Sequence, residues 1–291
     1  QPTFVGADCG TDGSAEGCIE ATLTIQPGTT ILGRTDVPQG IRGAYLVVSR
    51  GSRLVADATG EDRAPTAEEV IVFTSDRPRG ERARGDWGGI VINGQAPTNV
   101  GDEAQGEGDS GFYGGPDEND DSGILRGVRI EYAGDDVNSA DQLNGLALQG
   151  VGAGTTISYV QIHYNTDDGI EPFGGTVSVD HLVVTGIGDD SVDGTDGYRG
   201  FMQFILGQQR GDNADQGFEI SNNGDDGDLA CPGDLGRRGE LAAHPARSQR
   251  AFRRPHQRHR LGVHLLDHVE DLSVLHHAVH VGEEDGYVGR Q

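Results

Sequence analysis

The chain has 291 residues, a formal net charge of −25 and 48 glycines. So much glycine argues against a helical bundle, and the sequence lacks an apolar run of the ~20 residues that a membrane-spanning helix needs. The acidity disfavours binding to nucleic acid or anionic membranes, because phosphate contacts require cations. It is typical of a solvated surface that attracts divalent cations.

Residues 1–19 are predicted to form an N-terminal loop segment. Cys9 and Cys18 lie in this segment among glycines and aspartates. In an exported chain such a pair favours a disulfide, and two free thiols are the alternative. The first residue is Gln1 and no signal-peptide pattern precedes the fold, so we expect a processed form or a fragment.

Short alternating segments repeat along residues 20–228. Leu23–Ile31 resembles Leu46–Leu54, and Ile157–Glu171 resembles Val179–Asp193 with a shift of 22 positions. Each unit contains short strands joined by glycine-rich turns. This repeat length predicts an all-β, right-handed parallel β-helix with coils of about 22–26 residues. A leucine-rich horseshoe is disfavoured because its consensus is missing, and a β-propeller needs longer units.

The repeats extend upstream and downstream of this pair. Leu125–Tyr132 matches the strand that begins at Ile157 with a shift of 32, which indicates an insertion. Phe201–Leu206 is expected to follow Val179–Val184 by 22 positions.

Alternation within the strands assigns side chains to two faces of each coil. The inward positions are predicted to be Val128, Ile130, Tyr132, Val160, Ile162, Leu182 and Val184. The outward positions are predicted to be Arg129, Glu131, Gln161, His163, Val183 and Thr185. Trp87 lies between glycines and an apolar strand, which favours a packed corner over an exposed carbohydrate platform. The acidic, glycine-rich insertion Gly101–Gly123 is expected to cover one face of the stack or to bind cations.

Two acidic motifs occupy the same position in consecutive coils. "NTDDG" (Asn165–Gly169) aligns with "GDDS" (Gly188–Ser191), and Glu171 aligns with Asp193 and Glu219. Stacked carboxylates repel one another unless a cation, an arginine or a proton relieves them. Calcium takes 6–8 oxygen ligands, so one hypothesis is a calcium site. Turn chemistry without a ligand is the alternative, because aspartates cap backbone N–H groups at coil corners. The candidate calcium ligands are Asp168, Glu171, Asp190, Asp193, Asp196 and Glu219.

The character of the chain changes after residue 228. Residues 229–291 contain eight of the ten histidines and are rich in arginine. We expect an anomalous tail that is out of frame or disordered. The alternative is zinc binding, because His264 and His268 have the spacing of two ligands on one helix face, as have His276 and His280. A stack that ends near residue 228 would expose a strand edge and favour self-association.

Several long segments carry a resemblance to a known group of proteins. They are "GDWGGIVINGQAPTN" (Gly85–Asn99), "LRGVRIEYAG" (Leu125–Gly134), "GTTISYVQIHYNTDDGIEPFGG" (Gly154–Gly175) and "GDDSVDGTDGYRG" (Gly188–Gly200). These segments resemble uncharacterised bacterial secreted or surface proteins with a pectate-lyase-like, right-handed β-helix. The resemblance implies the fold and export to the cell surface, and it brings no established activity. For the function we expect a non-catalytic, adhesin-like surface scaffold whose partner is a polysaccharide or another surface component.

The two acidic motifs are also similar to motifs of the polygalacturonases, which share this fold. That resemblance implies Asp189 as general acid, with Asp167 and Asp190 activating water for inversion. The Gly-His-Gly motif of those enzymes is replaced by "RGDNADQG", and the chain has no lysine for their substrate-binding motif. A lyase is the less favoured alternative. It would need calcium and a base, for which Arg129 and Arg199 are the candidates.

Overall fold

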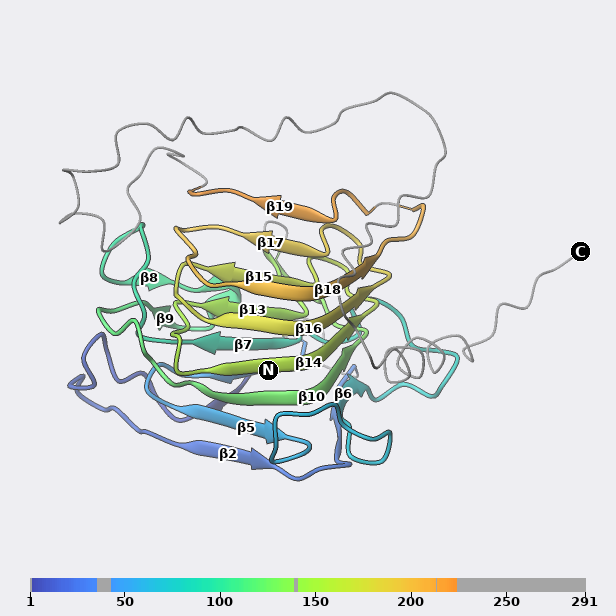
Figure 1. Cartoon of the computed structure of the whole chain (residues 1–291), viewed down its shortest axis with the longest axis horizontal. Coiled ribbons are helices and arrows are strands. Elements are labelled where there is room, and N and C mark those ends of the chain that lie inside the picture. Colours follow the sequence, from blue (N-terminus) through green and yellow to red (C-terminus); the bar gives the residue numbers. More distant parts are fainter. Residues whose placement is uncertain (1, 36–42, 139–140, 213, 224–291) are drawn as a thin grey trace, which may run out of the picture.

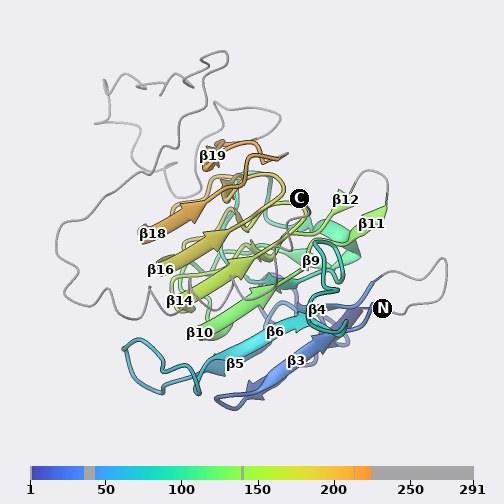
Figure 2. The same ribbon diagram turned by 90° about the vertical axis from the view of Figure 1, so that its right-hand side faces the viewer.

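A computed structural model describes residues 2–35, 43–138, 141–212 and 214–223, and within them strands build two large sheets (Figure 1). One sheet has seven strands in the order β1-β4-β7-β13-β15-β17-β19. The other has eight, with β18-β16-β14-β10-β5-β2 as its main path. Pairing is parallel throughout both sheets, and consecutive coils lie next to one another along the stack (Figure 2). This confirms the right-handed parallel β-helix. The predicted tail, 229–291, lies outside the described residues.

The strands have the following bounds. The seven-stranded sheet contains β1 (Pro2–Val5), β4 (Tyr45–Val48), β7 (Ile90–Asn93), β13 (Leu146–Gln149), β15 (Ile170–Phe173), β17 (Val192–Gly194) and β19 (Phe218–Ile220). The eight-stranded sheet contains β2 (Thr22–Ile25), β3 (Thr30–Gly33), β5 (Arg53–Asp57), β6 (Ile71–Ser75), β10 (Gly123–Glu131), β14 (Thr156–His163), β16 (Ser178–Thr185) and β18 (Met202–Gln208). Shorter elements are β8 (Ala104–Gln105), the 3-10 turn η1 (Glu107–Asp109), β9 (Phe112–Tyr113), β11 (Asp136–Asn138) and β12 (Asp141–Gln142).

The long strands of the second sheet bend at one left-handed residue each. β10 pairs with β5 before Gly127 and with β6 after it, and Gly127 has φ +67°. In the next three coils this position is held by Tyr159, His181 and Phe204, with φ of 52°, 50° and 57°. Left-handed backbone costs a non-glycine residue about 1–2 kcal/mol. Stacked rings offset this cost, with centroids 4.3 Å apart for Tyr159–His181 and 4.8 Å for His181–Phe204.

The apolar interior confirms most of the predicted inward positions. Val128, Val160 and Leu182 are buried in one core cluster, as are the other inward valine and isoleucines of these coils. Tyr132 is the exception. It is buried, but it follows β10 with φ 61°, and its ring packs against His163 rather than in this cluster. The chain leaves the strand before Tyr132, so the alternation no longer sets its direction.

Two of the predicted repeat alignments are wrong. Leu23 pairs with Leu54, whereas Leu46 belongs to the other sheet. Every strand of a β-helix alternates in the same way, so the pattern alone does not tell one sheet from the other. Val179 pairs with Met202, which makes this shift 23 positions rather than 22.

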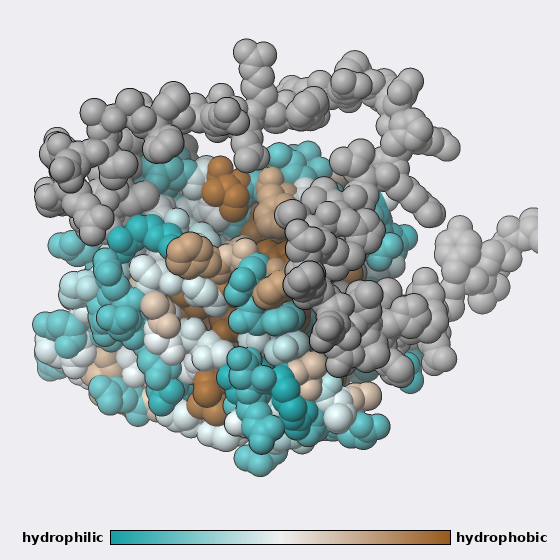
Figure 3. Space-filling model, viewed as in Figure 1, coloured by the Kyte–Doolittle hydropathy of each residue, from teal (hydrophilic) through white to brown (hydrophobic). Residues whose placement is uncertain are grey.

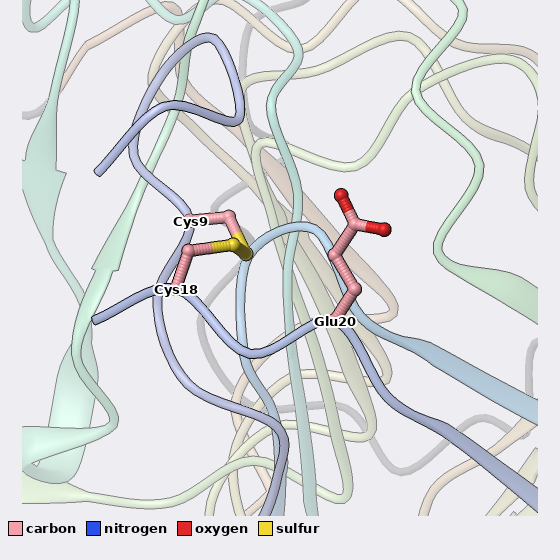
Figure 4. A group of neighbouring side chains, drawn as sticks. All are labelled: Cys9, Cys18 and Glu20. Carbon is pink, nitrogen blue, oxygen red and sulfur yellow. A yellow bond between two sulfur atoms is a disulfide. The ribbon is translucent and has the colours of Figure 1, made fainter. Parts of the chain in front are cut away.

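The N-terminal segment is more ordered than the predicted loop. β1 pairs with β4 and adds a strand to the seven-stranded sheet. The expected disulfide between Cys9 and Cys18 is present (Figure 4). Glu20 lies close to both sulfurs, but oxidised cysteines are not thiolate ligands, so this trio is not a metal site.

The predicted insertion follows β7 and lies on the outer face of the seven-stranded sheet. This agrees with the first of its two predicted roles, which was to cover one face of the stack. We call residues 101–115, which contain β8, η1 and β9, the flap. Its Tyr113 packs in a second apolar cluster with sheet residues such as Val91 and Phe173. Arg50, only 1% exposed, forms ion pairs with Asp8 and with Glu103 of the flap. The flap is therefore fastened to the sheet and to the N-terminal segment.

Trp87 forms the packed corner that was expected. It is 3% exposed, and its Nε1 donates a hydrogen bond of 2.8 Å to the carbonyl oxygen of Glu131.

Apolar side chains such as Phe204 and Phe218 are exposed at the end of the stack, where brown surface is visible in Figure 3. None of the helices in the described residues could cross a membrane, given their length and polarity.

Candidate functional site

One outward-facing column of the seven-stranded sheet changes from apolar to acidic along the stack. The pairing places these side chains side by side on successive strands. Neighbouring positions in such a column lie about 4.8 Å apart. The flap packs over Val47, Val91 and Ala147 of the apolar part, and the acidic part continues beyond them. Phe4, on the first strand of the column, is exposed. The column runs Phe4, Val47, Val91, Ala147, Glu171, Asp193 and Glu219.

Three carboxylates converge where this acidic part begins. One oxygen each of Asp168, Glu171 and Asp193 lie within 4.8 Å of one another. We call these three side chains the carboxylate cluster. Glu171 and Asp168 are 7% and 8% exposed. Asn144 donates from Nδ2 to Glu171 Oε2 at 2.5 Å, and Asp168 Oδ1 accepts from the backbone N–H of Asp190 at 2.9 Å.

Burial makes the charged forms of these carboxylates unfavourable. Burial, and then the charge of Asp167, raises the pKa of Asp168 to about 8. Burial and the nearby Glu107 raise the pKa of Glu171 well above its ordinary value, and burial raises that of Asp193. Among the described residues, no arginine forms an ion pair with any of the three. Near neutral pH the cluster therefore holds shared protons or a cation.

The predicted catalytic aspartates lie at the adjoining corner of the coils. Asp167 and Asp189 have carboxylate oxygens within 4.8 Å of each other. One oxygen each of Asp189, Asp190 and Asp215 also lie within 4.8 Å of one another. Asp189 and Asp215 are exposed, whereas Asp190 is buried. Burial, and then a hydrogen bond with Glu219, raises the pKa of Asp190 to about 7. Inverting glycosidases hold their carboxyl groups ~6.5–9.5 Å apart, so Asp167 and Asp189 approach more closely than inversion requires.

The parallel order of the strands in both sheets agrees with the comparison with known families. Residues 15–233 match the family described as the pectate-lyase-like β-helix domain. The chain belongs to this family. Comparisons with curated proteins and with solved structures return no significant match. Membership of the pectate-lyase-like family establishes the β-helix scaffold, and the site has to be argued from its own chemistry.

The six predicted calcium ligands do not all lie together in the pectate-lyase-like β-helix. Asp168, Glu171 and Asp193 come together, whereas Asp190 belongs to the neighbouring corner group. Glu219 extends the acidic column but lies outside the trio and is exposed. Asp196 instead accepts a hydrogen bond of 2.9 Å from the hydroxyl of Tyr113.

Two residues beside the cluster, Asn144 and Glu107, were not predicted from the sequence. Asn144 occupies the position of Asp168 in the preceding coil, so the repeat alignment contained the signal for it. Glu107 comes from the flap and reaches the cluster by way of Asn144, whose Nδ2 lies 3.0 Å from Glu107 Oε2. The flap has no counterpart in other coils, so repetition gives no information about where Glu107 lies.

Proposed function

We propose that the protein is an exported β-helix scaffold that binds calcium at the carboxylate cluster. The observation that carries this proposal is that the buried Asp168 and Glu171 lie beside the half-buried Asp193, and that no arginine within the described part of the chain forms an ion pair with any of them. Calcium takes 6–8 oxygen ligands, largely carboxylates and carbonyls, and binding it would remove the repulsion among the three. The cation would tie strands β15 and β17 of consecutive coils to the corner that precedes β15.

An extracellular or cell-surface location fits this role. The Cys9–Cys18 disulfide is typical of oxidising compartments. The exposed carboxylates of Asp189, Asp215 and Glu219 continue beyond the cluster. We propose that this acidic edge contacts a polysaccharide or another surface component, so that the molecule acts as an adhesin-like scaffold. The apolar end of the stack at β18 and β19 is the candidate surface for self-association.

Calcium-dependent thermal unfolding tests the proposal. Trp87 is buried and is the only tryptophan, so its emission reports unfolding of the β-helix. Calcium at 100 times its Kd stabilises a folded protein by about 2.7 kcal/mol, which raises Tm by several degrees. We expect a chelator to reverse this rise and the double variant Glu171→Gln/Asp193→Asn to lose it. Asp62→Asn, in the loop between β5 and β6, is the matched control. A Tm that calcium does not change would contradict the proposal.

A polysaccharide hydrolase is the second candidate. It is favoured by Asp190, whose pKa of about 7 keeps much of it protonated at neutral pH, beside the exposed Asp189. Such a pair has the proton donor that glycoside cleavage needs. The test is release of reducing sugar from a panel of acidic and neutral polysaccharides. Hydrolysis that is lost in Asp189→Asn would support an enzyme, and no release by the unmodified protein would exclude it for that panel. Unsaturated products would identify a lyase instead.

A further inference from the structure

One buried arginine connects the N-terminal segment to both ends of the flap hairpin. Arg50, which is 1% exposed, donates hydrogen bonds from Nε and Nη2 to the two carboxylate oxygens of Asp8, at 2.7 and 2.9 Å. The same guanidinium donates to Glu103 Oε2 at 2.6 Å and to the carbonyl oxygen of Gly114 at 2.9 Å. Glu103 directly precedes β8 and Gly114 directly follows β9, so a single side chain ties the two ends of the hairpin to the N-terminal segment.

The contact with Asp8 keeps this guanidinium buried. Without Asp8, the guanidinium of Arg50 loses both bonds of a bidentate pair, which is the strongest kind of charged hydrogen bonding. A buried charge that loses its partner is strongly destabilised. We therefore expect Arg50 to turn toward solvent when Asp8 is displaced, and its bonds to Glu103 and Gly114 would then be lost.

The disulfide fixes the position of Asp8. Cys9 follows Asp8 directly, is fully buried, and donates its backbone N–H to the carbonyl oxygen of Arg50 at 3.1 Å. Its sulfur is joined to that of Cys18, which closes a loop whose ends are 9 positions apart in the sequence. Reduction would return to this segment the conformational freedom that the closed loop removes. The segment would then hold the carboxylate of Asp8 in place less firmly.

The two sulfurs differ in their access to a reductant. Cys9 is 0% exposed, whereas Cys18 is half-buried, so an external thiol reaches Cys18 Sγ first. One carboxylate oxygen of Glu20 lies within 4.8 Å of both sulfurs (Figure 4). A negative charge at that distance disfavours the thiolate that leaves when the S–S bond breaks, and a disfavoured thiolate leaves more slowly. Glu20 therefore slows reduction of the disulfide without preventing it.

We propose that the Cys9–Cys18 disulfide is a redox-sensitive latch for the flap. While the bond is intact, Asp8 holds Arg50, and Arg50 holds both ends of the hairpin. When a thiol reductant cleaves the bond, these ends come loose from the N-terminal segment. The flap is thus sealed in an oxidising compartment and loosened in a reducing one. This role goes beyond the proposed function and does not depend on the calcium site.

A dithiol supplies the electrons and protons for this step. A thiolate of the reductant attacks Cys18 Sγ, the S–S bond breaks, and Cys9 leaves as a thiolate that takes up a proton. The second thiol of the reductant then attacks the mixed disulfide and releases Cys18 as a thiol. In total, two electrons and two protons pass from the dithiol to the two cysteines, and the reductant becomes a disulfide.

The tip of the flap has separate contacts with the sheet. The hydroxyl of Tyr45 donates to the Gly108 carbonyl oxygen at 2.6 Å, and Asn93 Nδ2 donates to that of Ser110 at 2.8 Å. These bonds involve neither Arg50 nor the N-terminal segment. Reduction should therefore loosen the ends of the hairpin more than its tip.

Hydrogen exchange at the end of the flap, followed by NMR with and without dithiothreitol, tests the proposal. The full chain carries Cys231→Ser, so that Cys9 and Cys18 are its only cysteines. The reporter is the N–H of Gly114, which donates to the carbonyl oxygen of Gly94 at 2.9 Å. Reduction should speed its exchange at least about tenfold.

Three variants separate a latch from a general loss of stability. Asp8→Asn should speed exchange at Gly114 while the disulfide is intact, and reduction should then add little. Asp12→Asn replaces an exposed carboxylate inside the closed loop and should leave the exchange unchanged. Glu20→Gln should speed reduction by dithiothreitol severalfold and leave the exchange of the oxidised protein unchanged.

Exchange at Gly114 that is equal in the oxidised and the fully reduced protein would overturn the proposal. Unfolding of the whole β-helix on reduction, seen in the emission of Trp87, would also overturn it, because the disulfide would then stabilise the entire fold and not the flap in particular. Equal effects of Asp8→Asn and Asp12→Asn would be a third contradiction. These outcomes concern the flap and the disulfide, and they leave the proposed calcium site standing.

Discussion

Replacement of Asp168 by asparagine tests whether the carboxylate cluster is strained when no ion is bound. The pKa of Asp168 is raised from 3.8 to about 8, so the folded state holds the proton more tightly than the unfolded state does. Its contribution to stability is therefore complete below pH 3.8 and is lost as the pH rises toward about 8. Each pH unit in that window removes about 1.4 kcal/mol, so ion-free protein should lose about 2.7 kcal/mol between pH 5 and pH 7 through this group.

The amide in the Asp168→Asn variant does not titrate, yet its oxygen can still accept the hydrogen bond from the Asp190 N–H. We therefore expect this variant to be more stable than the unmodified protein at pH 7 in chelator and to show a shallower fall of stability with pH. The assay is urea unfolding at pH 5, 6 and 7, followed by the emission of Trp87. Asp62→Asn should keep the original slope. Equal slopes for the unmodified protein and Asp168→Asn would refute the argument that burial penalises this carboxylate.

Three further predictions concern the scaffold, and urea unfolding measures each of them. Replacing Cys9 and Cys18 by serine should cost about 3 kcal/mol, because the unfolded chain regains the freedom of the closed loop, and no loss would show that the disulfide is not structural. Leu182→Ala removes a fully buried side chain and should cost about 2–5 kcal/mol, whereas a cost below about 1 kcal/mol would contradict its place in the core. Arg50→Met should cost about 2–3 kcal/mol through lost charged hydrogen bonds and should speed proteolysis of the flap, and an unchanged rate of cleavage would refute its fastening role.

The fold was predictable because each coil repeats one pattern of alternation and turns. Ile157 and Val179 could be aligned from the sequence, and the structure pairs them. The same uniformity caused the errors. The strands at Leu23 and Leu46 look alike, although they lie in different sheets.

The site was predictable only in the part that repeats. The stacking of Glu171 and Asp193 follows from the 22-residue shift between their coils. The place of Asp196 did not follow, because its hydroxyl partner Tyr113 belongs to the flap. Glu107 could not be placed for the same reason. An insertion packs against the surface of the stack through contacts that do not recur from coil to coil. A repeat pattern therefore does not predict them.

A crystal structure with anomalous diffraction data, from crystals grown with calcium, tests the central claim most directly. The account predicts a calcium peak at the carboxylate cluster, with oxygens of Asp168, Glu171 and Asp193 at about 2.3–2.6 Å from the ion. A cluster without such a peak at saturating calcium, with its carboxylates paired through shared protons, would contradict the account.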